Sequence, residues 1–157
     1  MKEQSLEENK STEKNWFYQK EKAKVVTKPW GKEIWINYRE GEKVGDEEKR
    51  YVLKKLYINA GTRTSFQYHE KKVETNFLIS GRVEAWFENE SGGIEKRIIE
   101  AGGIWTIPNG KKHRIITLTD IELIEASSPE VDDVIRLQDD TGRGDGRIAE
   151  EHQQSKP

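Results

Sequence analysis

The sequence predicts a single all-β domain, a sandwich or barrel of short strands, with a charged, flexible segment at each end. Short runs rich in Val, Ile, Tyr, Phe and Trp recur along the chain, and clusters of Gly, Pro and Asn separate them. No part of the body keeps the 3.6-residue apolar period of an amphipathic helix. A length of 157 residues favours one domain, and short strands at this spacing are typical of a sandwich or barrel.

Composition separates the predicted domain from its ends. Apolar residues make up 32% of the chain and charged residues 36%, a balance typical of disorder, but aromatic residues reach 9%. We therefore predict a compact body over residues 25–143, a charged N-terminal tail over 1–24 and a polar C-terminal tail over 144–157. In the first tail, only Trp16-Phe17-Tyr18 offers enough apolar surface to dock on the body.

Nine strands are expected, with turn signals between several of them. Ser80-Gly81-Arg82 and the stretch Glu90 to Gly93 are typical of tight hairpin turns, and Asn109-Gly110 is a pair that tolerates positive φ. A charged surface loop is expected over residues 40–48. The predicted strands cover residues 33–38, 51–59, 74–80, 83–88, 94–100, 104–107, 113–119, 121–126 and 131–136.

Charge and composition exclude several classes of protein. Lys and Arg total 27 and Asp and Glu total 29, and a net charge of −2 makes the chain a poor general nucleic-acid binder. The absence of Cys excludes disulfides, thiolate metal sites and thiol catalysis. The longest uncharged run, Ala101 to Gly110, is ten residues and too short to cross a bilayer. The first residues lack the apolar stretch of a signal peptide, so we expect a cytoplasmic protein without membrane contact.

Two of the three histidines lie in patterned segments, whereas His152 lies in the polar tail. Gln67 and His69 are two residues apart, so on a strand both face the same way, and Glu74 opens the next strand. A Pro-Asn-Gly corner delivers His113 to the start of another strand. Imidazole and carboxylate ligands together suit zinc, iron, manganese, nickel or cobalt. The alternative is a pair of structural histidines.

The spacing of these residues resembles the two motifs of the cupin superfamily. In the first motif Gln67 stands where many cupins have a first His, and in the second Thr117 stands where many have Asn. The resemblance implies a double-stranded β-helix, or jelly-roll barrel, with one metal inside. The matching positions are Gly61, Gln67, His69, Glu74 and Gly81 in the first motif and Gly102, Pro108, Gly110 and His113 in the second.

Further stretches are similar to type II mannose-6-phosphate isomerase, a cupin domain that occurs alone or fused behind a mannose-1-phosphate guanylyltransferase. The resemblance covers roughly residues 25–143 and implies a homodimer that holds one divalent ion, zinc in the first place, on Gln67, His69, Glu74 and His113. The matching stretches are Lys28 to Gly31, Lys54 to Gly61, Gln67 to His69, Ile107 to Arg114, Leu123 to Glu125, Asp132 to Arg136 and Asp139 to Arg143.

The resemblance implies a metal-dependent isomerase or epimerase of a sugar phosphate or nucleotide sugar. A metal would polarise neighbouring sugar oxygens while a base moves a proton, and Lys72, Lys54, Tyr68 or an unligated Glu74 could be that base. The candidates for substrate binding are Asn76, Lys112, Arg114 and Arg136. Because Asn76 shares the face of Glu74, Phe77 and Ile79 should face the other way, toward a dimer partner.

Two other functions stay open from the sequence. Lys72 replaces the family's Arg beside the metal motif, and Thr75 and Asn76 replace its His-Trp, which favours a non-catalytic cupin that binds a sugar or regulates a partner. An iron-dependent dioxygenase uses the same scaffold with a His-rich open site. Gln67 in place of a His disfavours that third function.

Overall fold

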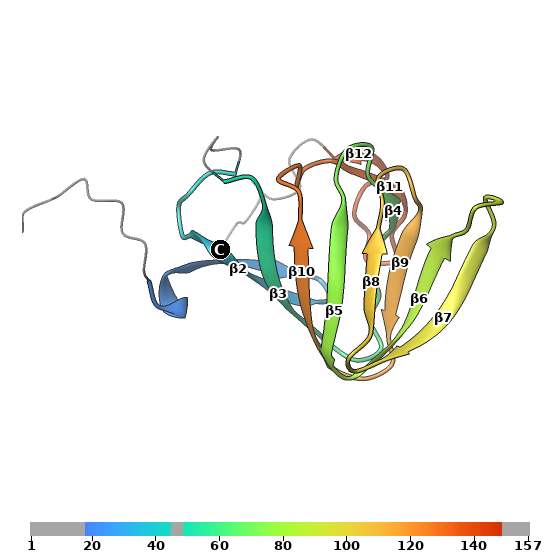
Figure 1. Cartoon of the computed structure of the whole chain (residues 1–157), viewed down its shortest axis with the longest axis horizontal. Helices are drawn as coiled ribbons and strands as arrows, with labels where there is room; N and C mark the ends of the chain where they lie inside the picture. The colour runs from blue at the N-terminus through green and yellow to red at the C-terminus, as the bar shows by residue number, and fades with distance from the viewer. Residues whose placement is uncertain (1–17, 45–48, 149–157) are drawn as a thin grey trace, which may run out of the picture.

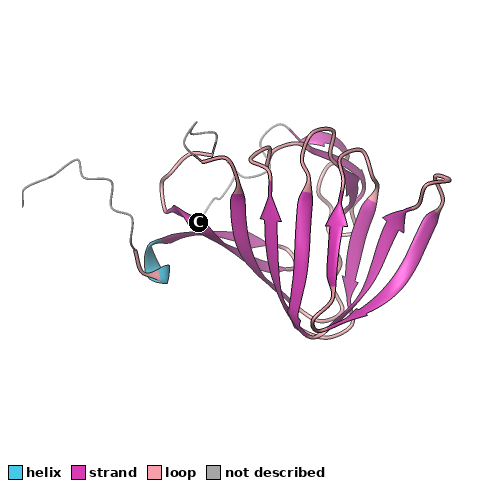
Figure 2. Ribbon diagram, in the orientation of Figure 1, coloured by secondary structure: helices cyan, strands magenta, loops and turns pink. Residues whose placement is uncertain are grey.

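The computed structural model describes residues 18–44 and 49–148, and strands dominate this part of the chain (Figures 1 and 2). Its one helical element is a short 3₁₀ turn, η1, at Lys20–Lys22. The strands are β1 Ala23–Lys28, β2 Gly31–Arg39, β3 Val52–Ile58, β4 Phe66–Tyr68, β5 Glu74–Ser80, β6 Arg82–Glu88, β7 Ile94–Glu100, β8 Ile104–Ile107, β9 His113–Thr117, β10 Ile121–Ser127, β11 Val134–Gln138 and β12 Gly146–Ile148.

The strands form two six-stranded antiparallel sheets, which confirms the all-β prediction. The first sheet has the order β1-β2-β3-β10-β5-β8 and the second β12-β11-β4-β9-β6-β7. Strands far apart in the sequence therefore pair side by side, as β10 does between β3 and β5. In Figure 1 strands β3, β10, β5 and β8 of the first sheet stand side by side in front, and β4 and β11 of the second sheet lie behind them. This pairing of strands that are distant in the sequence brings residues from both predicted motifs into one interior.

Each of the nine predicted strands has a counterpart, and β1, β4 and β12 were missed. In β1 only Ala23 and Val26 are buried, and β4 and β12 have three residues each, so their apolar signal is weak. The last predicted strand starts late, at Val134, because the N–H groups of Val131 and Asp133 donate to the carbonyls of Pro129 and Glu130 in a turn.

Regular structure also occurs within the segments assigned to the tails. The turn η1 and the first residues of β1 precede residue 25, and β12 pairs with β11 after residue 144. The Tyr18 hydroxyl donates to the carbonyl of Ile36 at 2.5 Å, so the chain contacts the body there. Residues 1–17, which include Trp16 and Phe17, and residues 149–157 lie outside the described residues.

Two of the predicted turns depend on glycines with positive φ. Gly81 has φ 87° between β5 and β6, and a Cβ there would lie 2.4 Å from the carbonyl oxygen of Asp120. Gly110 has φ 80°, and its N–H donates to the carbonyl of His69 at 2.5 Å. The Pro108-Asn109-Gly110 corner therefore fastens one predicted motif segment directly to the other.

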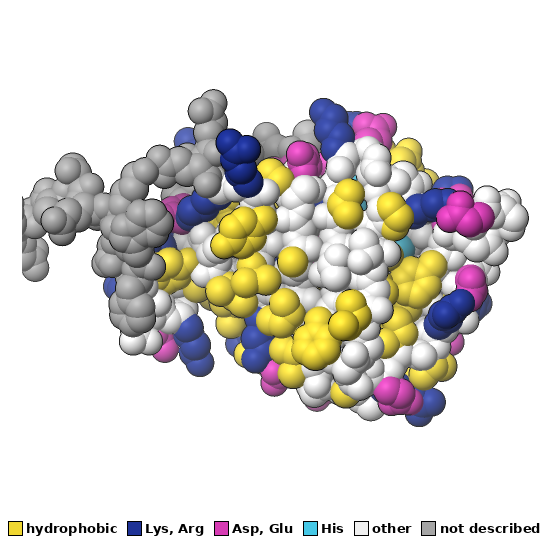
Figure 3. Space-filling view, in the orientation of Figure 1, with side chains coloured by type: hydrophobic (Ala, Val, Ile, Leu, Met, Phe, Trp, Pro, Cys, Tyr) yellow, Lys and Arg dark blue, Asp and Glu magenta, His cyan; other side chains and the backbone are white. Residues whose placement is uncertain are grey.

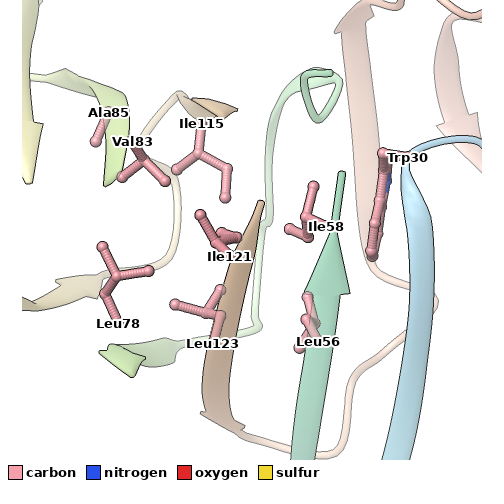
Figure 4. Close-up of a cluster of buried hydrophobic side chains, with 9 residues drawn as sticks. All are labelled: Trp30, Leu56, Ile58, Leu78, Val83, Ala85, Ile115, Ile121 and Leu123. Carbon is pink, nitrogen blue, oxygen red and sulfur yellow. The ribbon is translucent and has the colours of Figure 1, made fainter. Parts of the chain in front are cut away.

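Two apolar clusters fill the interior, and polar residues lie between them. On β3 the inward residues are Val52, Lys54, Leu56 and Ile58 in that order. Val52 belongs to one cluster, with Val26, Trp35, Tyr38 and Val131. Leu56 and Ile58 belong to the other, drawn in Figure 4 with Trp30, Leu78, Val83, Ala85, Ile115, Ile121 and Leu123. Lys54 falls between the two clusters, at the level of the predicted site.

The outer face of the first sheet is partly apolar. Figure 3 shows hydrophobic side chains gathered over the face that β3, β10, β5 and β8 form. Phe77 and Ile79 are 42% and 39% exposed, while Asn76 and Leu78 are buried, as the strand alternation predicts. The homodimer stays a prediction. Within the described residues, no helix has the length and apolar character needed to cross a bilayer.

Candidate metal centre

His69 is held rigidly at the end of β4. Its Nδ1–H donates to the carbonyl of Asp133 at 2.5 Å, so Nε2 is the nitrogen that keeps a free lone pair. The Asp133 carboxylate in turn accepts hydrogen bonds from the N–H groups of Lys71 and Lys72, at 2.5 and 3.0 Å. The segment before β11 therefore fixes both the imidazole ring and the loop that follows it.

Glu74 and His113 complete a cluster around His69. Glu74 is the first residue of β5 and His113 the first of β9. The Nδ1–H of His113 donates to the carbonyl of Lys111 at 3.0 Å, which again leaves Nε2 free. The two Nε2 atoms lie 3.6 Å (His69) and 3.8 Å (His113) from oxygens of Glu74, and all three residues are buried. Their candidate ligand atoms lie within 4.8 Å of one another, so the three residues could hold a metal ion.

The protonation states suit a cation site. Burial opposes ionisation of Glu74, but the Lys72 ammonium and the neighbouring imidazoles outweigh burial and hold the pKa of Glu74 well below its usual range. Burial lowers the pKa of His113 to about 4, against the opposing charge of Glu74. Near neutral pH the cluster therefore offers a carboxylate and a neutral His113 imidazole, which are the forms that bind metals.

The donor set itself passes a test of fit. The Nε2 atom of His69 is fully buried and has no hydrogen-bond partner among the described residues. A buried polar atom without a partner is costly, and a metal ion would satisfy it. Two imidazole nitrogens and one carboxylate oxygen are a common ligand set for zinc and for other transition metals.

Gln67, the proposed fourth ligand, lies directly opposite His113 on the neighbouring strand. Its side-chain oxygen accepts a hydrogen bond from the Ser65 hydroxyl at 2.5 Å. The amide therefore lines the same cavity as the three ligands, but its oxygen already has a partner. Its role as a ligand stays a prediction.

An interior polar layer of five charged residues, defined as Glu33, Lys54, Lys72, Glu74 and Glu125, extends from this cluster across the barrel. The Lys72 ammonium contacts Glu74 Oε2 at 2.5 Å and Glu125 Oε1 at 3.0 Å. The Lys54 ammonium lies 3.1 Å from Glu33 Oε2 and 3.9 Å from Glu125 Oε1. Each ammonium group thus lies between carboxylates. Burial would lower the pKa of Lys72, but the charges of Glu125 and Glu74 outweigh it and raise that pKa.

The cluster and the polar layer line one cavity of about 100 Å³. Of the proposed base and substrate-binding residues, Lys54, Lys72, Asn76 and Arg114 line it. Tyr68, Lys112 and Arg136 are not among its lining residues. Lys112 pairs with Glu88 at 3.4 Å, and Arg136 is buried where it donates to the carbonyl of Gly144.

Glu33 and Glu125 also line the cavity, and sequence reasoning missed both as site residues. The sequence does contain a signal for Glu125. This residue follows Ile121 and Leu123 at strand spacing, so it shares their inward face. Lys54 shares a strand face with Val52 and Leu56, and a Lys on such an apolar face needs a buried carboxylate nearby. Searching other strands for a carboxylate on an apolar face would have found Glu125.

Comparison with known proteins supports the same fold. No family model matches the chain. It is 30% identical over 121 residues to the mannose-1-phosphate guanylyltransferase ManC of Salmonella typhimurium, a match that covers 75% of this chain and 23% of that relative. The chain therefore covers less than a quarter of the length of this curated relative.

The solved structures extend the likeness at lower identity. Oxalate decarboxylase of Bacillus subtilis superposes with a TM-score of 0.63 at 15% identity, over 76% of this chain and 31% of that one. A second oxalate decarboxylase structure gives the same TM-score and identity. With the two antiparallel sheets described above, this likeness confirms that the chain has the cupin fold.

Proposed function

We propose that the chain is a metal-dependent isomerase or epimerase of a sugar phosphate or nucleotide sugar. The observation that carries this proposal is the buried set His69, Glu74 and His113, whose donor atoms converge at the wall of the cavity. A divalent ion held there would supply Lewis-acid polarisation of a sugar oxygen. Zinc is proposed first, one ion per chain, with iron, manganese, nickel or cobalt as alternatives.

Lys72 is proposed to donate a hydrogen bond to the substrate oxygen that gains negative charge. Its ammonium lies beside Glu74 and lines the cavity. The raised pKa of Lys72 keeps it protonated, which suits a donor better than a base. Lys54 also lies in the cavity wall and remains a candidate base, whereas Tyr68 is not among the lining residues.

Asn76 and Arg114 are proposed to bind the substrate. The Arg114 guanidinium is fixed by Asp140 at 2.8 Å and by the carbonyl of Thr64 at 3.1 Å. A cavity of about 100 Å³ is small for a whole nucleotide sugar. We therefore place only the reacting carbons inside, with the anionic group at Arg114. The name of the Salmonella relative, which refers to mannose 1-phosphate, supports a sugar phosphate as the substrate class.

A second candidate function is a non-catalytic cupin that binds a metal and a small ligand. The observation that favours it is the closed pairing of the interior polar layer, in which Lys72 already contacts Glu74. A site with paired charges and a small cavity is also suited to holding a ligand without changing it.

Proton NMR in deuterated water distinguishes the two functions. With metal bound, the chain is expected to interconvert an aldose and a ketose, or two epimers, and to exchange the proton at the reacting carbon. Mannose 6-phosphate with fructose 6-phosphate is the first pair to test. Both signals should disappear in His69→Ala and after chelation, because each removes the metal. Neither turnover nor exchange across a panel of phosphorylated and nucleotide-linked sugars, at full metal occupancy, would replace the isomerase by the binding protein.

A further inference from the structure

Glu125 is not a proposed ligand, and it is buried between the two ammonium groups of the interior polar layer. Its Oε1 atom contacts the Lys72 ammonium at 3.0 Å and lies 3.9 Å from the Lys54 ammonium. Its side chain is 10% exposed. A buried carboxylate in this position needs both cations, and Lys72 needs it in return.

Lys72 creates an electrostatic problem for a metal bound at Glu74. Its ammonium lies 2.5 Å from Glu74 Oε2, so it competes with a metal ion for that carboxylate and also repels the ion. Glu74 Oε1 accepts a hydrogen bond from the Asn76 side-chain amide at 3.3 Å and lies 3.8 Å from His113 Nε2. A carboxylate can serve both cations only if the ammonium is held on one oxygen and its charge is compensated by another anion.

We propose that Glu125 is a positioning residue that sets the affinity of the metal centre through Lys72. It shares the Lys72 ammonium with Glu74, so that Glu74 keeps an oxygen and enough negative charge for the ion. The inference rests on the proposed metal centre and adds to it a residue of β10, outside both ligand motifs. Lys54 and Glu33 continue the same alternation of charges beyond Glu125.

The effect of each substitution on metal affinity follows from the charges of the interior polar layer. Three carboxylates and two ammonium groups give it a net charge of −1. Glu125→Gln removes one negative charge and leaves Lys72 with Glu74 alone, so the ammonium draws harder on the metal's carboxylate. Lys72→Met instead removes the repelling cation. The double variant restores the net charge of −1, without any ammonium on Glu74.

Metal titrations of the full chain test the inference. Zn²⁺ affinity is measured by competition with a chelator, and Co²⁺ absorption reports the ligand set. Glu125→Gln is expected to bind Zn²⁺ about 10 to 100 times more weakly, the range found for groups that orient metal ligands. Lys72→Met should bind at least as tightly as the wild type, and the double variant should return to within about threefold of it, a non-additivity that a double-mutant cycle detects.

The matched control is Glu122→Gln on the same strand. Glu122 faces outward and pairs with Lys55 at 2.7 Å, so its loss should leave Zn²⁺ affinity unchanged. If Glu125→Gln does not fold, Lys72→Met still tests the inference, since weaker binding by that variant overturns it. Wild-type affinity in Glu125→Gln, or no recovery in the double variant, also overturns it and leaves the metal centre intact. A wild-type chain that binds no metal overturns the proposed function as well.

Discussion

The inner and outer faces of the β3–β10 strand pair carry the same types of residue and place them in opposite environments. On the outer face Lys55 pairs with Glu122 at 2.7 Å, with side chains 30% and 39% exposed. On the inner face Lys54 lies among Glu33 and Glu125, with its side chain 3% exposed. Neighbouring residues in the sequence thus form one solvated ion pair and one buried charge network.

The difference shows that an exposed ion pair and a buried charge network have different energetic consequences. An exposed ion pair contributes little to stability, because water screens it. A buried one costs desolvation, and breaking it by removing one partner is strongly destabilising. The inner charges lie between two apolar clusters that could have continued across the barrel. Their placement beside the ligand cluster is therefore consistent with a functional role.

Substitution of the two lysines should give the largest contrast. Lys54→Met leaves Glu33 and Glu125 without their shared cation and is expected to lower the free energy of unfolding by about 3 to 5 kcal/mol. Lys55→Met should change it by only about 0 to 1 kcal/mol. Urea unfolding followed by circular dichroism measures both. Equal effects of the two substitutions would contradict the contrast between the faces.

The apolar cluster beside the polar layer should respond almost as strongly. Leu78 is completely buried on β5, and Leu78→Ala should cost about 2 to 5 kcal/mol through lost burial and a cavity. Leu78 is not among the residues that line the cavity, so Zn²⁺ affinity of the folded variant should stay close to that of the wild type. Titration at a temperature well below the melting point checks this. A large loss of affinity would mean that the cluster and the site are one unit.

Acid should destabilise the metal-free chain through His113. Its pKa of about 4 in the folded state lies below the ordinary value of 6.5, so between these values the unfolded chain binds a proton that the folded chain does not. Stability present above pH 6.5 is therefore lost progressively as the pH falls toward 4, by up to about 3 kcal/mol. Urea unfolding with chelator at several pH values measures this. His113→Gln should flatten the profile between these limits, and an unchanged slope would count against a neutral, buried His113.

The outer apolar face should show the smallest effect on folding. Phe77 is 42% exposed, and Phe77→Ser should change the stability of one chain by less than about 0.5 kcal/mol. If this face joins two copies, as predicted, sedimentation should give twice the 18.3 kDa chain mass for the wild type and a smaller mass for the variant. A monomeric wild type would contradict the predicted homodimer.

The candidate metal ligands could be predicted from the sequence, whereas the ion pairs of Glu125 with Lys72 and Lys54 could not. His69, Glu74 and His113 lie at motif spacings next to Gly and Pro turns, and local patterns of this kind survive in a single sequence. The contacts of Glu125 depend on β10 pairing between β3 and β5. Because β3 ends at Ile58 and β10 begins only at Ile121, no local spacing indicates that Lys72 and Lys54 will meet the same carboxylate.

The strands, too, could be predicted where the local sequence pattern is strong and were missed where it is weak. Long strands such as β5 and β6 were predicted nearly to the residue, because the Gly81 turn separates two runs rich in apolar and aromatic residues. The short strand β4 was missed and ends before His69, although Gln67 and His69 both line the cavity. Three residues hold too little pattern to be recognised, and β4 is specified by its neighbours β9 and β11.

The central claim is that His69, Glu74 and His113 hold a metal ion. Calorimetric titration of Zn²⁺ into the chelator-treated full chain near pH 7 tests it most directly. We predict one ion per chain, loss of binding in the His69→Ala plus His113→Ala variant, and no change in His152→Ala. Absence of binding in the wild type, or equal binding by the double variant, would contradict it.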